Sequence, residues 1–348
     1  MNYDKHIVLL TPGFARDEQD TTCTTFLQDY VLAMKKLHPN YLIDIIAIQY
    51  PYDRTNYQWN GVDVYSARGK LSKYLSRLVT WAKVLIKLSA LNRKLKIDVI
   101  HAFWLTEATF VAQLFQFFKK TKVIAYTIGQ DSIPQNRYLK FISSRIMIVG
   151  MSEQIKNNLN RLNITCDKII PLGINSSKLA KPESQRTIDI IGIGSLIPLK
   201  NYSLFIEIVS ELKKIFSTIK AVIIGNGEEY AILQKKINEL NLEDNITLKG
   251  QLSHTEVFEQ LAKSKILLHT SSFEGQSTVM MEALAMGTNI ICFDVGRMNH
   301  SEKIVACTTK EEMTERLKDC LQTGQLTFEP IIYSMDNTVN EFVKLYVS

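Results

Sequence analysis

The feature that most constrains the fold is a repeated alternation of a short apolar run with a longer amphipathic stretch. Short runs bounded by turn residues predict buried strands, and the stretches between them predict covering helices, for example over 203–216, 228–240, 255–264 and 310–322. The predicted strands are 6–11, 41–48, 98–102, 122–126 and 145–149 in the first half, and 187–194, 220–224, 245–249, 265–270 and 289–292 in the second. The alternation predicts α/β architecture with parallel sheets covered on both faces.

The rhythm changes over near residues 171–175, which predicts two doubly wound, Rossmann-like domains of 1–174 and 175–333 facing a central cleft. A last helical pattern follows Pro330 and predicts a terminal helix over about 334–348. Up to Asn175 the chain has 23 basic and 13 acidic residues, whereas the remainder has 18 and 22. The net charge is therefore positive in the first half and negative in the second, which suggests that the two halves have different partners. Ligands of such sheets bind at the carboxyl ends of the strands.

Composition excludes several classes of protein. The chain has 348 residues, 46% hydrophobic and 22% charged, which fits a globular protein rather than a disordered or fibrous one. No apolar run is long enough to span a membrane, and the amino-terminal run is too short for a signal peptide. Five cysteines, far apart and without a C-x-x-C pair, disfavour disulfides and a zinc site. We therefore expect a cytoplasmic protein.

The first segment with a chemical signal is the turn after the predicted strand 187–194. Gly194 and Ser195 open a loop that reaches Lys200 just before a helix. Glycines in such a turn let backbone amides approach an anion, and the helix amino terminus adds a favourable dipole. Lys200 would add a full positive charge beside a phosphate. The alternative is a turn that is glycine-rich for packing and a solvated lysine.

The second segment follows the predicted strand 265–270. Glu274 lies on a loop, Gly275 permits a tight turn, Ser277 is the expected N-cap of a helix, and Glu282 lies inside that helix. Carboxylates of this kind hydrogen-bond well to sugar or ribose hydroxyls. The alternative for Glu282 is a solvated surface position, which its apolar neighbours disfavour, because a carboxylate among them needs a partner.

Several motifs occur in order. They are Gly-Ser-Leu…Lys-Asn from Gly194, Val-Ile-Ile-Gly-Asn-Gly-Glu from Val222, Leu-Lys-Gly ending at Gly250, and His-Thr-Ser-Ser-Phe-Glu-Gly-Gln-Ser…Met-Glu-Ala-Leu-Ala-Met-Gly from His269. This series resembles the family-four group of retaining glycosyltransferases (glycosyl transferases group one), which have the GT-B architecture. The resemblance is dense over 189–296 and looser in the first half. It implies that the terminal helix crosses back onto the first domain.

The resemblance also implies roles for individual residues. Lys200 would bind the donor diphosphate, Glu274 and the amides after it the donor sugar and β-phosphate, and Glu282 the ribose. Lys200 and Glu274 would be the catalytic groups. The whole donor site would comprise Gly194, Ser195, Lys200, Gly225, Gly227, Gly250, Glu274, Gly275, Gln276, Ser277 and Glu282. The family needs no metal or other cofactor, and the electrostatics of Lys200 and a helix amino terminus would stabilise the leaving group.

The chain departs from the family at two positions. The family usually has Arg where Ser195 stands, and usually has His, facing the donor sugar, where Ile128 stands. The candidates on the acceptor side are Gly13 and the polar residues His101, Gln130 and Asp131. For His101, which ends a predicted strand, a structural role is the alternative.

A third segment, residues 68–96, is basic. It has nine Lys and Arg residues and no acid. At helical spacing, Lys73, Arg77, Lys83 and Lys87 fall on one arc, and apolar residues fall on the opposite arc (Leu71, Tyr74, Leu75, Leu78, Trp81, Leu85 and Ile86). This arrangement is typical of peripheral contact with an anionic membrane. The alternative is an ordinary covering helix. Binding of nucleic acid is not expected, because the basic residues of this segment lack interleaved aromatic side chains on which nucleotides could stack.

The resemblance therefore implies a nucleotide-sugar-dependent glycosyltransferase acting on a lipid-linked or surface-glycan acceptor at the cytoplasmic face of a bacterial membrane, and the basic segment supports that placement. Two alternatives stay open. One is a non-catalytic donor-binding or partner subunit with the same fold. The other is a sugar-nucleotide epimerase, which the glutamate motif fits poorly.

Overall fold

The computed structural model describes residues 3–20, 23–69, 74–179, 185–274, 277–295, 303–324, 326 and 329–348. It divides into two compact units, Met1–Gly173 together with Met335–Ser348, and Ile174–Ser334. The division falls within one residue of the change in sequence pattern. No helix in the described ranges combines the length and apolarity needed to cross a bilayer.

The first unit contains a largely parallel sheet. Over the described residues its strand order is β3-β4-β2-β1-β5-β6-β7-β8, and the pair β3–β4 is antiparallel while every other neighbouring pair is parallel. The strands are β1 (Lys5–Gly13), β2 (Tyr41–Tyr50), β3 (Asn56–Trp59), β4 (Val62–Ser66), β5 (Val99–Phe103), β6 (Lys122–Thr127), β7 (Met147–Gly150) and β8 (Lys168–Ile169). The five strands predicted for this half are confirmed.

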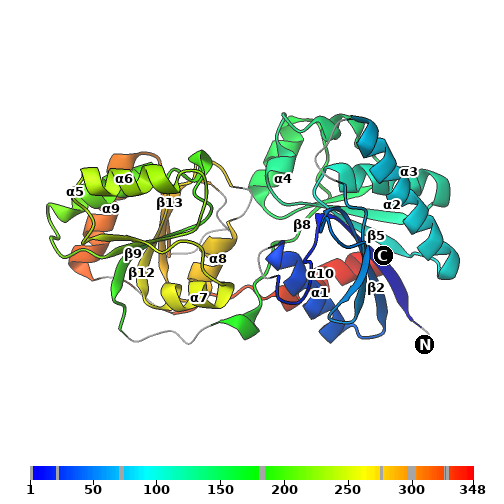
Figure 1. Cartoon of the computed structure of the whole chain (residues 1–348), viewed down its shortest axis with the longest axis horizontal. Helices are drawn as coiled ribbons and strands as arrows, with labels where there is room; N and C mark the ends of the chain where they lie inside the picture. Colours follow the sequence, from blue (N-terminus) through cyan, green and yellow to red (C-terminus); the bar gives the residue numbers. More distant parts are fainter. Residues whose placement is uncertain are drawn as a thin grey trace. The chain divides into compact units, whose positions relative to one another are not determined.

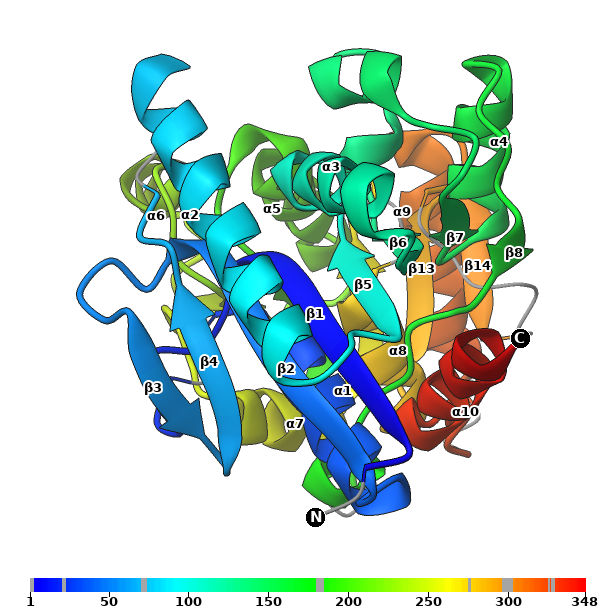
Figure 2. The same cartoon turned by 90° about the vertical axis from the view of Figure 1, so that its right-hand side faces the viewer.

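Helices cover both faces of this sheet. Helix α1 (Thr25–Leu37) packs beside α10 (Met335–Val347) on one face, and α2 (Tyr74–Lys94) packs beside α3 (Glu107–Lys119) on the other (Figures 1 and 2). The remaining elements are α4 (Glu153–Arg161) and the 3-10 turns η1 (Gln130–Ser132) and η2 (Arg137–Phe141). Burial of apolar side chains from both faces explains why the strand sequences are continuously apolar rather than alternating.

The terminal helix α10 returns to the first unit, as predicted (Figure 1). Its Tyr346 hydroxyl lies 2.5 Å from the Tyr30 hydroxyl of α1 and 2.6 Å from His101 Nδ1 of β5. At its start, the Thr338 hydroxyl accepts from Gly173 N and donates to Pro171 O, both at 2.8 Å. Buried polar contacts and aromatic packing therefore fix the helix at both ends.

The second unit contains a sheet whose described strands are all parallel, in the order β11-β10-β9-β12-β13-β14. They are β9 (Ile188–Ile193), β10 (Ala221–Ile224), β11 (Ile246–Leu248), β12 (Ser264–His269), β13 (Asn289–Phe293) and β14 (Ile304–Cys307). The helices are α5 (Tyr202–Lys213), α6 (Tyr230–Glu239), α7 (His254–Ala262), α8 (Thr278–Ala285) and α9 (Lys310–Thr323), with 3-10 turns η3 (Ser176–Lys178) and η4 (Pro198–Lys200).

Successive strand residues of this unit enter two different cores. Ile190 packs with α5, α6 and α9, whereas Ile191 packs with α7 and α8. Side chains alternate across a strand, so helices on both faces require apolar residues at both positions. The predicted pair of doubly wound units is confirmed.

Four strands were not predicted: β3, β4, β8 and β14. The hairpin β3–β4 closes through Asn60 and Gly61, which both have positive φ (46° and 71°). An Asn-Gly pair between two short strands is a strong hairpin signal, and it was the available clue.

The predicted buried and exposed faces of the basic helix α2 are wrong in part. Leu78 and Ile86, assigned to the inward arc, are 56% and 66% exposed. Arg77, assigned to the outward arc, is half-buried, and its Nε lies 3.5 Å from Glu107 Oε1. The buried positions of α2 are instead Thr80, Val84, Leu88 and Leu91. Apolar residues occur on both sides of this helix, so periodicity alone could not set its orientation. Residues 70–73, with Leu71 and Lys73, lie outside the described ranges, and no side-chain position is described for Tyr74 or Leu75.

Candidate functional site

The candidate site lies at the carboxyl edge of the second unit's sheet, where the loops after β9, β10 and β12 meet. Leu196 N donates to Asn226 O at 3.0 Å, which joins the first two loops. They lie so close that a Cβ on Gly225 would be 1.8 Å from Gly194 O, and one on Gly227 would be 2.3 Å from Leu196 O. Backbone packing therefore accounts for both glycines, and their assignment as nucleotide contacts stays a prediction.

Two other loop residues face open space. Gly250 has φ +69°, and a Cβ added there would meet no atom within 4 Å. Ser195 is exposed. Both positions are accessible from solvent at this edge, so their predicted place beside a ligand agrees with their exposure.

The loops after β9 and β12 are tied together by their backbones. Ser272 N donates to Leu199 O at 3.0 Å, and the Thr270 hydroxyl donates to Lys200 O at 2.8 Å. These bonds bring the Lys200 ammonium onto Glu274 Oε1, with which it forms a half-buried ion pair. The two predicted catalytic residues, 74 positions apart in sequence, therefore meet.

Glu274 is also held by a histidine that the sequence analysis did not single out. His269, at the end of β12, is buried, and its Nε2 lies 3.4 Å from Glu274 Oε1. Burial by itself raises the pKa of Glu274, but hydrogen bonding from His269 and the charge of Lys200 outweigh it and lower that pKa to about 2. Glu274 is therefore a carboxylate at neutral pH.

Ser277 occupies the predicted N-cap position of α8, but its side chain does not cap the helix. Its hydroxyl instead lies 3.1 Å from His269 Nε2. The predicted N-cap position is confirmed, and the Ser277 hydroxyl contacts the buried His269 rather than the backbone of α8. The first backbone N–H groups of a helix point outward and favour an anion. Gly275 and Gln276, predicted beside them, lie outside the described residues.

Glu282, on α8, has the partner that its apolar surroundings require. His254 Nε2, from the start of α7, lies 2.7 Å from Glu282 Oε1, and the Glu282 side chain is 13% exposed. The capping box of Ser253 and Glu256 fixes the start of α7 and with it the position of His254. Sequence reasoning missed this histidine because the pairing joins two helices.

The arrangement combines one ammonium, two carboxylates with fixed orientation and an amino-terminal helix end. Such a set can bind a phosphorylated ligand at its positive part and hydroxyl groups at its carboxylates. Over the described ranges, no group of three or more His, Cys, Asp and Glu side chains is arranged to hold a metal ion.

Comparison with known proteins bears on the same segment. Residues 175–321 match the family model described as "Glycosyl transferases group 1". This match falls within the second unit of the chain. The match begins at the start of the second unit and includes Lys200, Glu274 and Glu282. The glycosyltransferase family predicted from the motifs is therefore confirmed.

Curated relatives match over part of the chain. The chain is 31% identical over 115 residues to a poly(ribitol-phosphate) alpha-N-acetylglucosaminyltransferase of Staphylococcus aureus, covering 33% of this chain and 23% of that protein. It is 34% identical over 105 residues to an N-acetylgalactosamine-N,N'-diacetylbacillosaminyl-diphospho-undecaprenol 4-alpha-N-acetylgalactosaminyltransferase of Campylobacter jejuni, covering 30% and 27%. The matches thus span about a quarter of each relative's length.

Solved structures match the whole chain. A glycosyltransferase from Rickettsia africae has a TM-score of 0.75 at 15% identity, covering 99% of this chain and 98% of that one. An Anabaena protein solved in complex with UDP and glucose has a TM-score of 0.74 at 14% identity, covering 99% of each. These likenesses show the fold, and the predicted GT-B class is confirmed.

Two of the acceptor-side candidates, His101 and Asp131, are buried in the first unit. His101 is fully buried between Phe103 and Phe342, and burial lowers its pKa to about 3. Asp131 is buried as well, and burial raises its pKa. Its carboxylate accepts from the backbone N–H groups of Leu105, Ile128 and Gly129. Both side chains stabilise the first unit from within and do not face solvent.

The other two acceptor-side candidates stay predictions. Gly13 ends β1 and is buried, and Gln130 is exposed in η1.

The structure adds a cluster near the carboxyl ends of β2 and β5 that the sequence did not reveal. Glu107, in the first turn of α3, accepts from Gln49 Nε2 at 3.2 Å and lies beside Arg77. Tyr138 lies near this glutamate, and burial together with the Glu107 charge raises the pKa of Tyr138 to about 12.

Proposed function

We propose that the chain is a nucleotide-sugar-dependent glycosyltransferase that transfers its sugar with retention of configuration and without a metal ion. The observation that carries this proposal is the Lys200–Glu274–His269 arrangement beside the uncapped start of α8, within a group 1 glycosyltransferase domain. Positive groups and a fixed carboxylate adjoin one another there, as the transfer of a sugar from a diphosphate requires.

Lys200 would neutralise the diphosphate leaving group. In the structure its ammonium is paired with Glu274, so it is already positioned at the carboxyl edge of the sheet. A diphosphate would take over part of that contact, and the α8 amino terminus would add its dipole. Donors placed in advance where negative charge develops lower the barrier without reorganisation during the reaction.

Glu282 would accept hydrogen bonds from the ribose hydroxyls. His254 occupies one of its oxygens and fixes the plane of the carboxylate, which leaves the other oxygen for the ligand. UDP is the first nucleotide to test, because the Anabaena protein of the same fold was solved with it.

The acceptor would be a lipid-linked or surface glycan bound by the first unit. The names of the Campylobacter and Staphylococcus relatives specify a diphospho-undecaprenol glycan and a poly(ribitol-phosphate). The first name specifies a lipid-linked glycan and the second a phosphate-linked polymer, which supports an acceptor of one of these classes for this chain.

Peripheral contact with an anionic membrane at the cytoplasmic face is part of this proposal. Between 74 and 152 the chain has twelve basic and three acidic residues, and two of those acids, Glu107 and Asp131, are buried. Helices α2 and α3 pack beside each other in one layer (Figure 2). Exposed apolar side chains of this layer are Ile86 of α2 and Phe117 (70%) and Phe118 (72%) of α3. Basic residues beside exposed apolar ones suit a surface of anionic headgroups over acyl chains.

Co-sedimentation with vesicles tests this contact. The chain should bind phosphatidylglycerol vesicles and not phosphatidylcholine vesicles, and Phe118→Ser should weaken the binding. Each basic residue near an anionic surface contributes about 1 kcal/mol, so 0.5 M salt should release the protein. Equal binding to both lipids would contradict an electrostatic contact.

A turnover assay tests the enzymatic proposal against the non-catalytic alternative, which the exposed Ser195 in place of the family's arginine favours. Lys200→Ala should lower turnover of a UDP-sugar by about 10²-fold, the usual loss on removing one group that stabilises the developing charge. Lys235→Ala, on the exposed face of α6, is the matched control and should leave turnover unchanged. Binding of nucleotide by the wild-type chain with no turnover on any acceptor would support the non-catalytic subunit instead.

A further inference from the structure

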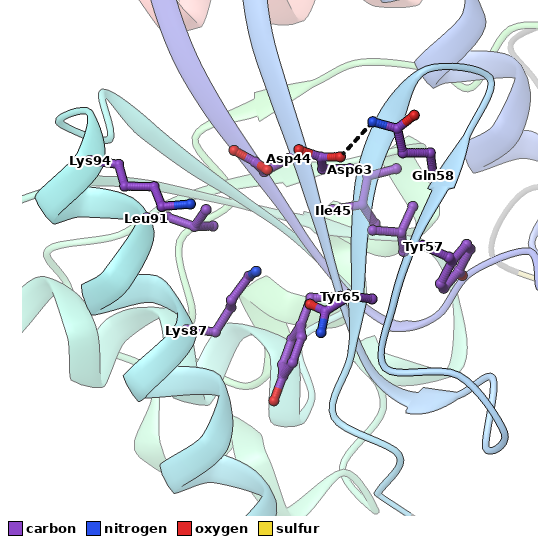
Figure 3. Close-up of a pocket in the computed structure, with 11 residues that line it drawn as sticks. Asp44, Ile45, Tyr57, Gln58, Asp63, Tyr65, Lys87, Leu91 and Lys94 are labelled. Carbon is purple, nitrogen blue, oxygen red and sulfur yellow. Dashed lines mark hydrogen bonds between the residues drawn. The ribbon is translucent and has the colours of Figure 1, made fainter.

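A groove lies on the first unit between β2, the β3–β4 hairpin and the carboxyl-terminal half of α2 (Figure 3). Its volume is about 340 Å³, within the range of about 300–1,000 Å³ for small-molecule sites. It lies toward the amino ends of β2 and β4, away from the carboxyl ends where Gly13 and Glu107 are found. No residue assigned to the proposed reaction lines it.

One wall of the groove is acidic. Asp44 of β2 and Asp63 of β4 are register partners on adjacent parallel strands, so their side chains lie on the same face of the sheet (Figure 3). Like charges in such a pair destabilise a sheet unless other groups compensate. Buried His6 holds one oxygen of Asp44 at 2.8 Å, and Gln58 Nε2 donates to one oxygen of Asp63 at 3.1 Å. Among the described residues, the second oxygen of each carboxylate has no hydrogen-bond partner.

The opposite wall is basic. Lys87 and Lys94 are two helical turns apart on α2, and both point toward the sheet (Figure 3). Lys87 Nζ lies 5.2 Å from the centre of the Tyr65 ring. Within the described ranges, neither lysine comes within 4 Å of a carboxylate oxygen, although two carboxylates line the same groove. Opposite charges therefore face each other across an unfilled space.

The lining indicates the class of ligand. Two carboxylates of the lining face two ammonium groups, so a phosphate would meet the carboxylates and a metal cation would meet the lysines. A hydroxyl group can donate to a carboxylate and accept from an ammonium at the same time. The half-buried Tyr65 ring, with Lys87 Nζ over it, adds apolar carbon beside these polar groups that can contact the carbon face of a sugar ring. A neutral polyhydroxylated ring satisfies all of these groups.

We propose that this groove is a secondary saccharide-binding site, separate from the donor site. If the proposed function is right, its occupant is a distal part of the acceptor glycan. The hydroxyls of one or two neutral sugar residues would bridge Asp63 to Lys87, with the ring against Tyr65. Binding there would hold a long acceptor while its end is extended elsewhere in the chain.

Saturation-transfer NMR with the full chain tests the site directly. The probes are chitotriose, maltotriose and the fully deacetylated, cationic form of chitotriose. At least one neutral trisaccharide should show transfer that persists with saturating UDP and in Lys200→Ala. Lys87→Met and Asp63→Asn should each weaken that binding at least fivefold, and Lys83→Met, on the exposed side of α2, should not change it. Circular dichroism verifies that each variant is folded.

The outcomes separate this proposal from the proposed function. If Lys87→Met weakens saccharide binding but the wild-type chain has no glycosyltransferase activity, the saccharide site is supported and the enzymatic proposal fails. No transfer to either neutral trisaccharide, stronger binding of the cationic one, or binding insensitive to both groove variants would overturn the site. UDP-sugar hydrolysis should be unchanged by Lys87→Met, since that lysine is not part of the donor site.

Discussion

The Glu274 carboxylate should stabilise the second unit by an amount that its pKa sets. That pKa lies near 2 in the folded chain against an ordinary 4.5, because hydrogen bonding from His269 and the charge of Lys200 exceed the effect of burial. A shift of one pKa unit corresponds to 1.36 kcal/mol, so the ionised form contributes about 3 kcal/mol to folding. Its side chain is 16% exposed, and solvent screening of the pair is limited.

The sign of the pH dependence follows from a depressed pKa. The stabilisation is fully present above about pH 4.5, and it is lost as the pH falls toward 2. Glu274→Gln removes the charge, so at pH 7 the variant should unfold at lower urea concentration, with a free energy of unfolding about 3 kcal/mol below that of the wild type. The difference should shrink as both proteins are measured at pH 5, 4 and 3.

Urea titrations followed by far-UV circular dichroism give this difference. Tryptophan fluorescence does not report on the second unit, because Trp59, Trp81 and Trp104 all lie in the first. Glu239→Gln, which removes an exposed ion pair with Lys235, is the control and should change stability by less than about 0.5 kcal/mol. A loss below 1 kcal/mol for Glu274→Gln, or a loss independent of pH, would refute the reasoning.

Three further predictions concern single residues. Gly225→Ala should lower the free energy of unfolding in urea by about 3 kcal/mol or more, because the added Cβ would meet backbone atoms. Gly250→Ala should lower it by about 1 kcal/mol, from the strain of a positive φ alone. Equal losses would contradict the close approach of the loops. His254→Ala should raise the donor KM about tenfold with a smaller effect on kcat, and His254→Gln should restore part of it; an unchanged KM would remove its positioning role. Tyr346→Phe should destabilise the first unit by about 1–3 kcal/mol, read from tryptophan fluorescence, since it leaves the buried His101 Nδ1 without its partner; no change would show that this bond is dispensable.

Much of the fold was predictable because the parallel strands are continuous apolar runs. The failures have physical reasons. Strands such as β8, with two residues, carry too few side chains to show a pattern. Helix α2 has apolar residues on two sides, and only packing against the sheet selects Val84 over Ile86 for burial.

The candidate site was predictable in its outline and not in its supporting contacts. The motifs located Lys200 and Glu274, because the loops that carry them follow predicted strands. His269 and His254 escaped notice, since each supports a glutamate through a contact made only in the folded chain. The burial of His101 could not be predicted, because a histidine at a strand end has the same sequence signal whether α10 covers it or solvent does.

Nucleotide binding tests the central claim most directly. Thermal unfolding of the purified chain should be measured with UDP, GDP, CDP and ADP, in parallel for the wild type and Lys200→Ala. A ligand that binds only the folded chain stabilises it by about 2.7 kcal/mol at a hundredfold excess over its Kd. The account predicts that one diphosphate raises the Tm of the wild type and raises that of Lys200→Ala much less. No response to any nucleotide, or an equal response in the variant, would contradict a donor site at Lys200 and Glu274.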